Sequence, residues 1–257
     1  MTWKICVFLA ACTLVVAAPL AAQENRAWFE RTFVTIDLPF QALNNDFSES
    51  LTFADSVRRT ENVNFLVHYP STRGALFDVG AGVRLTTNVG VGVTGSWSQR
   101  SNSGSFDLKL PNPLVANSPL ELTGAISDLH RSEMGFHIQA LYARPLGRNV
   151  RVMLSGGPSI FKTTQDVIRS VEVDILPGFR SLQFDEALIT EDKQTSLGFN
   201  VGADITWAFA EHIGVGTVTR YSRANVTWKP QSESGLSRAF ETHAGGLHIG
   251  GGIRLLF

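Results

Sequence analysis

The sequence predicts an all-β fold, an eight-stranded antiparallel up-and-down β-barrel that crosses a membrane. Three observations predict it. Large apolar residues alternate with glycine and small polar residues in successive segments, the connections between these segments alternate between short and long, and the chain ends on an amphipathic segment closed by Phe257. A period of two places these residues on opposite faces of extended strands, and the contrast between the faces suits lipid on one side and a crowded polar interior on the other.

Composition excludes several other classes of protein. The chain has 257 residues and a formal net charge of −1, with no basic block that would favour a nucleic-acid partner. Its 23 glycines and 17 phenylalanines favour a β-rich chain. Beyond the N-terminal region no apolar run is long enough for a membrane-spanning helix, so a membrane location would depend on strands.

The N-terminus reads as a cleaved secretory signal peptide over residues 1–22, with Lys4 before an apolar run and small residues at the cleavage site. A transmembrane anchor and a lipidated Cys12 are the competing interpretations. Both cysteines precede residue 23, so a cleaved chain could form no disulfides. Residues 23–257 are then expected to form one barrel domain.

The expected elements follow from the alternation. Eight strands are predicted within residues 27–40, 75–85, 89–97, 134–146, 150–161, 196–207, 213–226 and 247–257. Short turns are expected at residues 86–88, 147–149 and 208–212. Long polar stretches are expected at residues 41–74, 98–132, 162–194 and 227–241. Within the first stretch, residues 51–53 and 63–67 are expected as strand extensions beyond the membrane; within the second, Pro111, Pro113 and Pro119 keep parts of the chain out of any ladder.

The apolar face is expected to point outward. Segment 77–84 shows the contrast, because Phe77, Val79 and Ala81 alternate with Asp78, Gly80 and Gly82. A glycine-rich face would leave holes in a water-facing surface, whereas inside a narrow barrel it makes room for larger neighbours. A soluble barrel with an apolar interior is the alternative.

Inward charges are expected to pair, since an unpaired charge inside a narrow barrel is costly. The prediction is a network of ion pairs that plugs the lumen. Its expected members are Asp37, Asp78, Arg84, Arg151, Asp204, Arg220 and Arg254. The alternative is that several sit at the wet mouths of the barrel without partners, Arg84 and Arg254 first among them because they lie near the turns.

Together these features resemble the OmpA/OmpX/OmpW-type small outer-membrane barrels of Gram-negative bacteria. Ile253, Leu255 and Phe257 are similar to the C-terminal signal that the barrel-assembly machinery reads in that family, although Ile249 stands where the signal usually begins with a polar residue. The resemblance implies location in the outer membrane, short periplasmic turns and long extracellular loops. It implies contact with membrane lipid and with the assembly machinery, and a monomer is expected. It implies no particular activity.

The chain shows no local catalytic, cofactor-binding or metal-binding motif. The one inward pair to inspect for hydrolase chemistry is His137 with Ser155, and interior filling is the simpler account of both. The expected function is therefore non-enzymatic, structural or loop-mediated binding. A narrow conduit for small or hydrophobic solutes is the alternative, for which Leu141, Met153 and Phe161 hint at an apolar pocket near the loop end. An outer-membrane hydrolase or acyltransferase is the third class.

Overall fold

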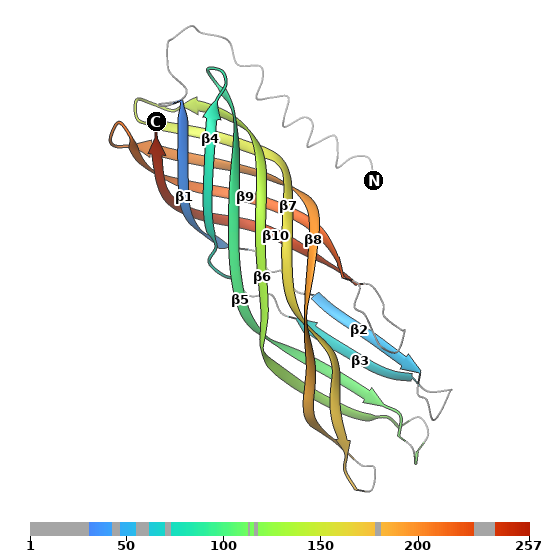
Figure 1. Cartoon of the computed structure of the whole chain (residues 1–257). Helices are drawn as coiled ribbons and strands as arrows, with labels where there is room; N and C mark the ends of the chain where they lie inside the picture. The colour runs from blue at the N-terminus through green and yellow to red at the C-terminus, as the bar shows by residue number, and fades with distance from the viewer. Residues whose placement is uncertain are drawn as a thin grey trace.

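Eight antiparallel strands close into a ring in the computed structural model of the chain (Figure 1), because β5 pairs with both β4 and β6. The structure describes residues 31–42, 47–54, 62–69, 73–112, 114–115, 118–177, 181–228 and 240–257. Around the ring the order is β5-β4-β1-β10-β9-β8-β7-β6. These strands are β1 (Thr32–Gln41), β4 (Phe77–Arg84), β5 (Val89–Leu110), β6 (Leu120–Pro145), β7 (Val150–Ile175), β8 (Leu182–Ala208), β9 (Ile213–Trp228) and β10 (Phe240–Leu256). The predicted eight-stranded antiparallel barrel is confirmed.

One end of the ring, the turn end, carries the three short hairpin connections and the C-terminus (Figure 1). The first and last strands join there, where the backbone N–H of Thr32 donates to the carbonyl of Phe257 at 2.9 Å and that of Phe257 donates back at 2.8 Å. The seam continues along the register from Phe33↔Leu256 to Gln41↔His248. Pro39 stays within this ladder opposite Gly250, whereas the pairing of β1 with β4 ends at Asp37.

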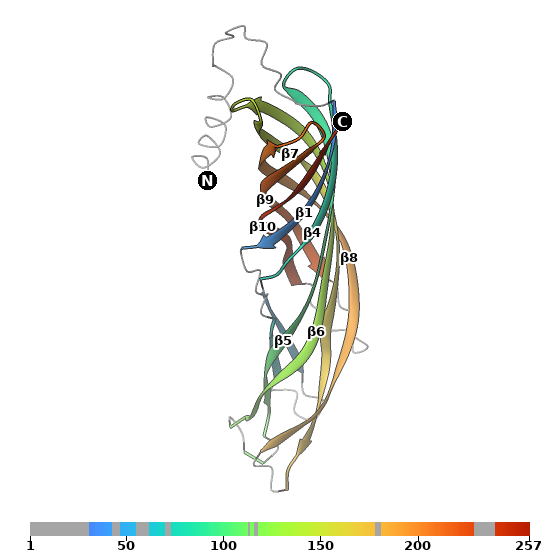
Figure 2. The same cartoon turned by 90° about the vertical axis from the view of Figure 1, so that its left-hand side faces the viewer.

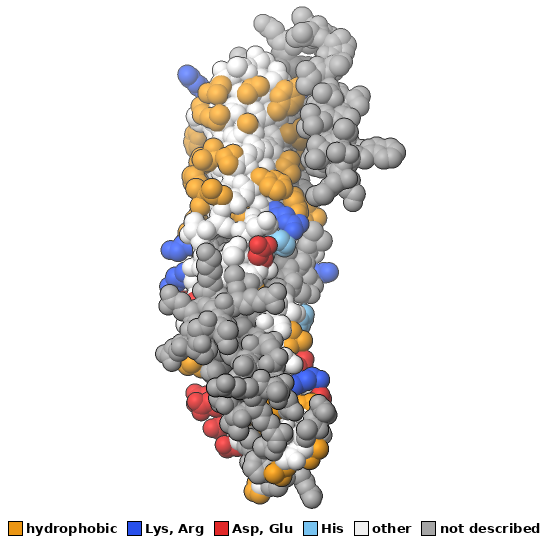
Figure 3. All heavy atoms as spheres, turned by 90° about the vertical axis from the view of Figure 1, so that its right-hand side faces the viewer, with side chains coloured by type: hydrophobic (Ala, Val, Ile, Leu, Met, Phe, Trp, Pro, Cys, Tyr) orange, Lys and Arg blue, Asp and Glu red, His pale blue; other side chains and the backbone are white. Residues whose placement is uncertain are grey.

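The apolar face points outward, as predicted. Leu38 is 68 % exposed, whereas its neighbour Asp37 is 4 % exposed, and the same contrast recurs on the other ring strands. Figure 3 shows hydrophobic side chains spread over the surface of the half that holds the turn end. The soluble barrel with an apolar interior is therefore wrong, because the inward positions are largely glycine, hydroxyl, amide and charged residues.

At the opposite end, the outer end, the sheet continues well beyond the ring (Figures 1 and 2). The β5–β6 and β7–β8 hairpins extend there, and the hairpin of β2 (Phe47–Ala54) and β3 (Asn62–Tyr69) pairs with β5. Residues 51–53 and 63–67, expected as strand extensions, are strands of this separate hairpin and do not extend a strand of the ring. Stretches 98–132 and 162–194 are mostly strand, contrary to the loops expected. Among the described residues the strands are interrupted between Leu110 and Leu120 and between Ile175 and Leu182.

These extensions form strands because they bury a core of their own. We call this part the outer sheet: β2, β3 and the segments of β5 to β8 beyond the ring. Its buried residues are Phe65, Val67, Tyr69, Phe106, Leu108, Leu120, Ile126, Leu129, Ile168 and Leu182. The Tyr69 hydroxyl accepts the backbone N–H of Ile168 at 3.0 Å, which ties β3 to β7 across this core. The outer sheet is thus a packed unit continuous with the barrel.

Two glycines bend the last strand at its outer end. Gly245 and Gly246 have φ values of +86° and +154°, and the first lies in the left-handed region that favours glycine. β10 pairs with β1 only as far as His248 and continues beside β9 to Phe240. β1 itself ends at Gln41, so the outer segment of β10 lies beside β9 alone among the described strands.

Residues 1–30 lie outside the described part of the chain, and the predicted signal peptide over residues 1–22 lies among them. No helix of the described part is long and apolar enough to cross a membrane.

Candidate functional site

The lumen of the ring is filled by layers of side chains, beginning with a buried ion-paired trio. Arg254 of β10 lies between Asp37 of β1 and Asp204 of β8; its Nη1 is 2.7 Å from Asp37 Oδ1 and its Nε is 3.1 Å from Asp204 Oδ2. Arg254 Nη2 also contacts Asp204. Reaching β8 requires crossing β9, and Gly216 makes room there, since a Cβ on it would lie 2.8 Å from Arg254 Nε.

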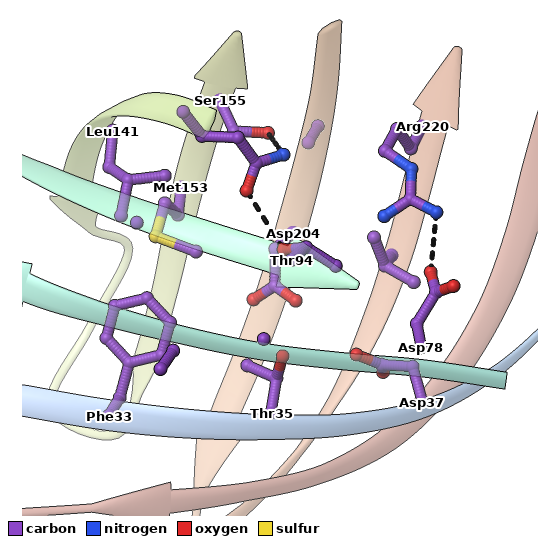
Figure 4. A pocket seen from close by; sticks show the side chains of 16 residues that line it. Phe33, Thr35, Asp37, Asp78, Thr94, Leu141, Met153, Ser155, Asp204 and Arg220 are labelled. Atoms are coloured by element: carbon purple, nitrogen blue, oxygen red, sulfur yellow. Dashed lines mark hydrogen bonds and ion pairs between the residues drawn. The ribbon is translucent and has the colours of Figure 1, made fainter. Parts of the chain in front are cut away.

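A second buried pair spans the lumen from β9 to β4. Arg220 Nη2 lies 2.7 Å from Asp78 Oδ2, and both side chains are 3 % exposed (Figure 4). Asp78 stands opposite Asp37 in the β1–β4 register, so two carboxylates are neighbours. Each has its own guanidinium partner, which offsets their mutual repulsion. Arg220 also lies 3.4 Å from Nδ1 of His248.

The other two predicted members of the network lie apart from these pairs. Arg151 is fully buried, and its guanidinium lies 5.3 Å from the ring centroid of Phe33. Arg151 Nη2 also lies 3.4 Å from the hydroxyl of Thr206, and that hydroxyl donates to Asp204 at 2.6 Å. Arg84 is partly exposed at the turn end and makes no ion pair within the described residues. The alternative in which Arg254 is solvated is wrong, because Arg254 is buried between two carboxylates and Gly216 leaves room for its side chain.

An apolar floor closes the lumen at the turn end. It consists of Phe33, Leu141, Ala143, Met153 and Leu256, all buried. Leu141 and Met153 therefore lie at the opposite end from the place where a conduit pocket was expected. Phe161 belongs to a separate cluster near the outer end with Ala224, Val226, Trp228 and Ala244. The structure does not bring the three hinted pocket residues together.

A chain of hydrogen bonds fills the wall of the lumen between β5 and β8. Its members in order are Ser96, His137, Ser159, Asn200 and Gln139. The Ser159 hydroxyl lies 2.8 Å from His137 Nδ1, Asn200 Nδ2 donates to Ser159 at 2.9 Å, and His137 Nε2 lies 3.1 Å from the Ser96 hydroxyl. With Asn200 donating to Ser159, these contacts suit a Ser159 hydroxyl that donates to Nδ1 and a His137 proton on Nε2.

This chain replaces the inspected pair of His137 with Ser155. In the β6–β7 register His137 stands opposite Ser159, and Ser155 stands opposite Leu141, so the two are not partners. Ser155 instead lies 3.5 Å from the amide of Gln139. No carboxylate of the described residues hydrogen bonds to His137, so the described residues do not form a Ser-His-Asp arrangement around it. The described residues also hold no cluster of metal-ligating side chains.

The outer mouth of the lumen is bridged by a pair that sequence reasoning missed. Arg131 Nη2 and Glu133 Oε1, both on β6, lie 2.7 Å apart and are largely buried. Arg131 Nη2 donates to the carbonyl of His243 at 2.9 Å, and Glu133 accepts the backbone N–H of Gly245 at 3.1 Å. The bent end of β10 is thus fastened to β6 across the mouth. The alternation along β6 places Arg131 and Glu133 on the inward face with His137, so their inward position could have been predicted. The alternation does not identify their partners.

Arg223 and His243 lie on the neighbouring strands β9 and β10 at this mouth. Arg223 Nη2 lies 2.8 Å from His243 Nε2. Burial, and then the Arg223 guanidinium, lower the pKa of His243. A neutral imidazole can accept the hydrogen bond from Arg223, which suits this contact.

One small cavity remains between the floor and the charged layer, with a volume of about 50 Å³ (Figure 4). Phe33, Met153, Asp78 and Arg220 are among the side chains that surround it. Asp78 Oδ1 and Arg220 Nε are buried there without a hydrogen-bond partner. A water needs roughly 10–15 Å³ of such space, so the cavity suits a few waters and no larger solute.

The outer sheet has several strand edges without a partner strand among the described residues, including those of β2, of β6 from Leu120 to His130, and of β8. β8 pairs with β7 from Leu182 onward, but its pairing with β9 begins only at Gly198. Along the segment from Leu182 to Leu197 no described strand pairs with the other side of β8. Asp185, Glu186 and Glu191 of this edge are exposed. Figure 3 shows acidic side chains gathered along one margin of the outer sheet.

The residues of the predicted assembly signal lie on the outward face of the closing seam. Ile253 is 51 % exposed and Phe257 is 61 % exposed, while Leu255 is half-buried. Their recognition by assembly machinery stays a prediction.

Comparison with known proteins places the chain in a family. Residues 8–250 match the family described as outer membrane protein beta-barrel domain. Among solved structures, OprG of Pseudomonas aeruginosa is 12% identical over 91% of this chain and 100% of its own, with a TM-score of 0.46. Neisserial surface protein A is 13% identical over 88% of this chain and 97% of its own, with a TM-score of 0.41. Ail of Yersinia pestis is 9% identical over 88% of this chain and 99% of its own, with a TM-score of 0.33. No curated protein matches. Because the matched region covers most of the sequence, this chain belongs to the outer membrane protein beta-barrel domain family.

Proposed function

We propose that this protein is a closed, non-enzymatic outer-membrane barrel that binds an extracellular partner through its outer sheet. The observation that carries the proposal is the contrast between its two halves. The lumen is occupied by an apolar floor, ion pairs and a hydrogen-bonded wall, whereas the outer sheet has a packed core and an edge without a strand partner among the described residues.

The open edge of β8 supports binding by strand addition. An unpaired edge offers a row of backbone N–H and C=O groups to an extended segment of another chain. The exposed Asp185, Glu186 and Glu191 favour a positively charged segment. They also disfavour pairing between two copies of this edge, because like charges would meet. This supports a monomeric barrel whose partner is an extended cationic peptide segment.

The filled lumen weighs against the conduit as the main function. A solute would have to displace the trio of Asp37, Arg254 and Asp204 as well as the floor. In planar bilayers the refolded chain is expected to show no large, steady conductance. Such a conductance would contradict a closed barrel and favour the conduit. A hydrolase is disfavoured because His137 lacks a carboxylate partner within the described residues.

Location in the outer membrane, after removal of residues 1–22, is part of the same proposal. The exposed apolar band supports direct contact with lipid, and the near-neutral charge of the chain supports no nucleic-acid partner. Fractionated cells are expected to hold the protein in the outer membrane, in a form that changes gel mobility on boiling. Recovery as a soluble periplasmic protein would contradict it.

The binding proposal is tested with labelled peptides and the refolded full chain in detergent micelles. A peptide of alternating lysine and valine is expected to bind, and a glutamate–valine peptide and a proline-interrupted lysine peptide are not. Replacing Asp185, Glu186 and Glu191 together by amides is expected to weaken binding about tenfold, since each exposed charge contributes a few tenths to one kcal/mol. Equal binding of the proline-interrupted peptide would show that charge attraction alone binds the peptide, without strand addition.

Two proline variants of β8 test the edge itself. Ile189 and Thr190 are consecutive, so their backbone N–H groups point to opposite sides of the strand. One of Ile189→Pro and Thr190→Pro therefore removes a ladder hydrogen bond to β7, and the other blocks only the open edge. The variant that keeps the wild-type unfolding midpoint is expected to lose peptide binding. Binding retained by that variant would contradict strand addition at β8.

A further inference from the structure

A hollow of about 390 Å³ lies on the wall formed by β1, β4, β5 and β6, on the side away from the lumen. Its lining is apolar and includes Val34, Val79, Ala81, Trp97 and Phe136. The four strands are neighbours in the ring, in the order β1-β4-β5-β6 (Figure 1). The hollow is therefore separate from the lumen and from the open edge of β8.

The hollow lies beside an outward position on β5 that has no side chain, Gly95. In the register, Gly95 stands between Val79 of β4 and Phe136 of β6. Trp97 lies across this position, since a Cβ on Gly95 would come within 2.6 Å of Trp97 Cη2. The small Ala81 thus forms the floor of the hollow, and the aromatic rings of Trp97, which covers Gly95, and of Phe136 form its walls.

The hollow lies within the apolar band that contacts lipid. Trp97 is 40 % exposed and Phe136 is 46 % exposed, as expected of side chains that face hydrocarbon. Trp97 is also the last large apolar residue of β5 before the polar run from Ser98 to Ser105. Its ring lies 6.1 Å from that of Phe77, a pairing typical of the aromatic girdle at one interface of the bilayer.

We propose that this hollow binds one acyl chain of a membrane lipid. The lining offers apolar side chains and no charged group, so the ligand it fits is hydrocarbon. Because the hollow lies within the apolar band, bilayer lipid is in direct contact with it. A second copy of this protein fits less well, because a two-fold interface brings the same patch of both copies together, and two facing hollows would leave a void.

Filling the hollow tests the proposal. Ala81→Leu adds a side chain on the floor, and Ala140→Leu makes the same change on an outward, exposed position of β6 outside the hollow. Each full-length protein is refolded in dimyristoylphosphatidylcholine vesicles, extracted into detergent and examined by native mass spectrometry. Heat-modifiable migration on a gel checks that each barrel is folded.

The wild type and Ala140→Leu are expected to retain one phosphatidylcholine molecule through extraction, and Ala81→Leu is expected to retain at least about fivefold less. Equal retention by all three proteins, or no retained lipid on the wild type, would overturn the proposal. A wild-type dimer that disappears in Ala81→Leu would assign the hollow to a second copy and overturn it as well. None of these outcomes bears on peptide binding at β8, so the two proposals stand or fall separately.

Discussion

Arg254 on the last strand and Asp37 on the first strand form an ion pair of 2.7 Å across the seam where the barrel closes. The pair joins residues from opposite ends of the sequence. Arg254 extends the link to Asp204 on β8, so a single guanidinium connects three strands of the ring.

Removing this guanidinium is expected to destabilise the barrel strongly. Arg254→Ala would leave the Asp37 and Asp204 carboxylates buried without their cation, and breaking a buried pair in this way typically costs about 3–5 kcal/mol. Urea unfolding in vesicles, followed by gel mobility, measures the loss. Arg84→Ala is the matched control, because Arg84 lies on the same inward face but has no ion-pair partner in the described residues. Equal unfolding midpoints for the two variants would show that the ion-paired trio contributes nothing to the stability of the barrel.

The two inward serines of β7 are expected to respond differently to loss of the hydroxyl. Ser159→Ala would leave His137 Nδ1 and an amide hydrogen of Asn200 without their partner, at about 1–3 kcal/mol. Ser155→Ala removes only a 3.5 Å contact with Gln139 and is expected to change stability by less than about 0.5 kcal/mol. Denaturant midpoints of both proteins check this. A larger loss for Ser155→Ala would contradict the hydrogen-bond chain.

The bend in β10 is expected to need a glycine at position 245. Gly245→Ala would place a Cβ at φ +86° and within 2.5 Å of the Ser222 carbonyl oxygen, with a cost of about 1–3 kcal/mol. Gly147→Ala at the turn end is the control, because no described atom lies within 4 Å of the added Cβ. Amide exchange at Gly245 and Gly246 should rise only in the first variant. Unchanged exchange there would mean that the contacts with Arg131 and Glu133 tolerate the change.

The strands and their faces could be predicted from the sequence, because a period of two decides which side chains share a side. The partners within the lumen could not. Asp204 meets Arg254 only because β8 and β10 flank β9 in a closed ring and Gly216 leaves a passage between them. The same parity made Ser155 and Ser159 equivalent as partners for His137, and only the β6–β7 register separates them.

The parts of the outer sheet that belong to β5, β6, β7 and β8 were missed for a different reason. Their outward positions are mostly polar, so segments 98–132 and 162–194 lack the contrast that marks a lipid-facing strand. Their apolar members, such as Phe106, Leu129 and Ile168, are inward residues of a water-exposed sheet. In the outer sheet the apolar residues face inward, whereas in the barrel they face outward. Because this change occurs within single continuous strands, the alternation of the sequence did not show that the strands continue.

The terminal aromatic residue is expected to matter more for assembly than any single residue of the outer sheet. Deleting Phe257 removes an exposed ring on the outward face of the seam. It also removes the backbone hydrogen bonds that join Phe257 to Arg31 and Thr32. Both losses fall where the last strand closes on the first, so the amount of folded protein in the outer membrane is expected to drop several-fold. Phe257→Tyr keeps the ring and the backbone and should assemble normally, and Leu114→Ala at an exposed tip of the outer sheet should have no effect. Heat-modifiable migration of outer-membrane fractions measures all three, and wild-type amounts of the deletion variant would count against a role of Phe257 in assembly.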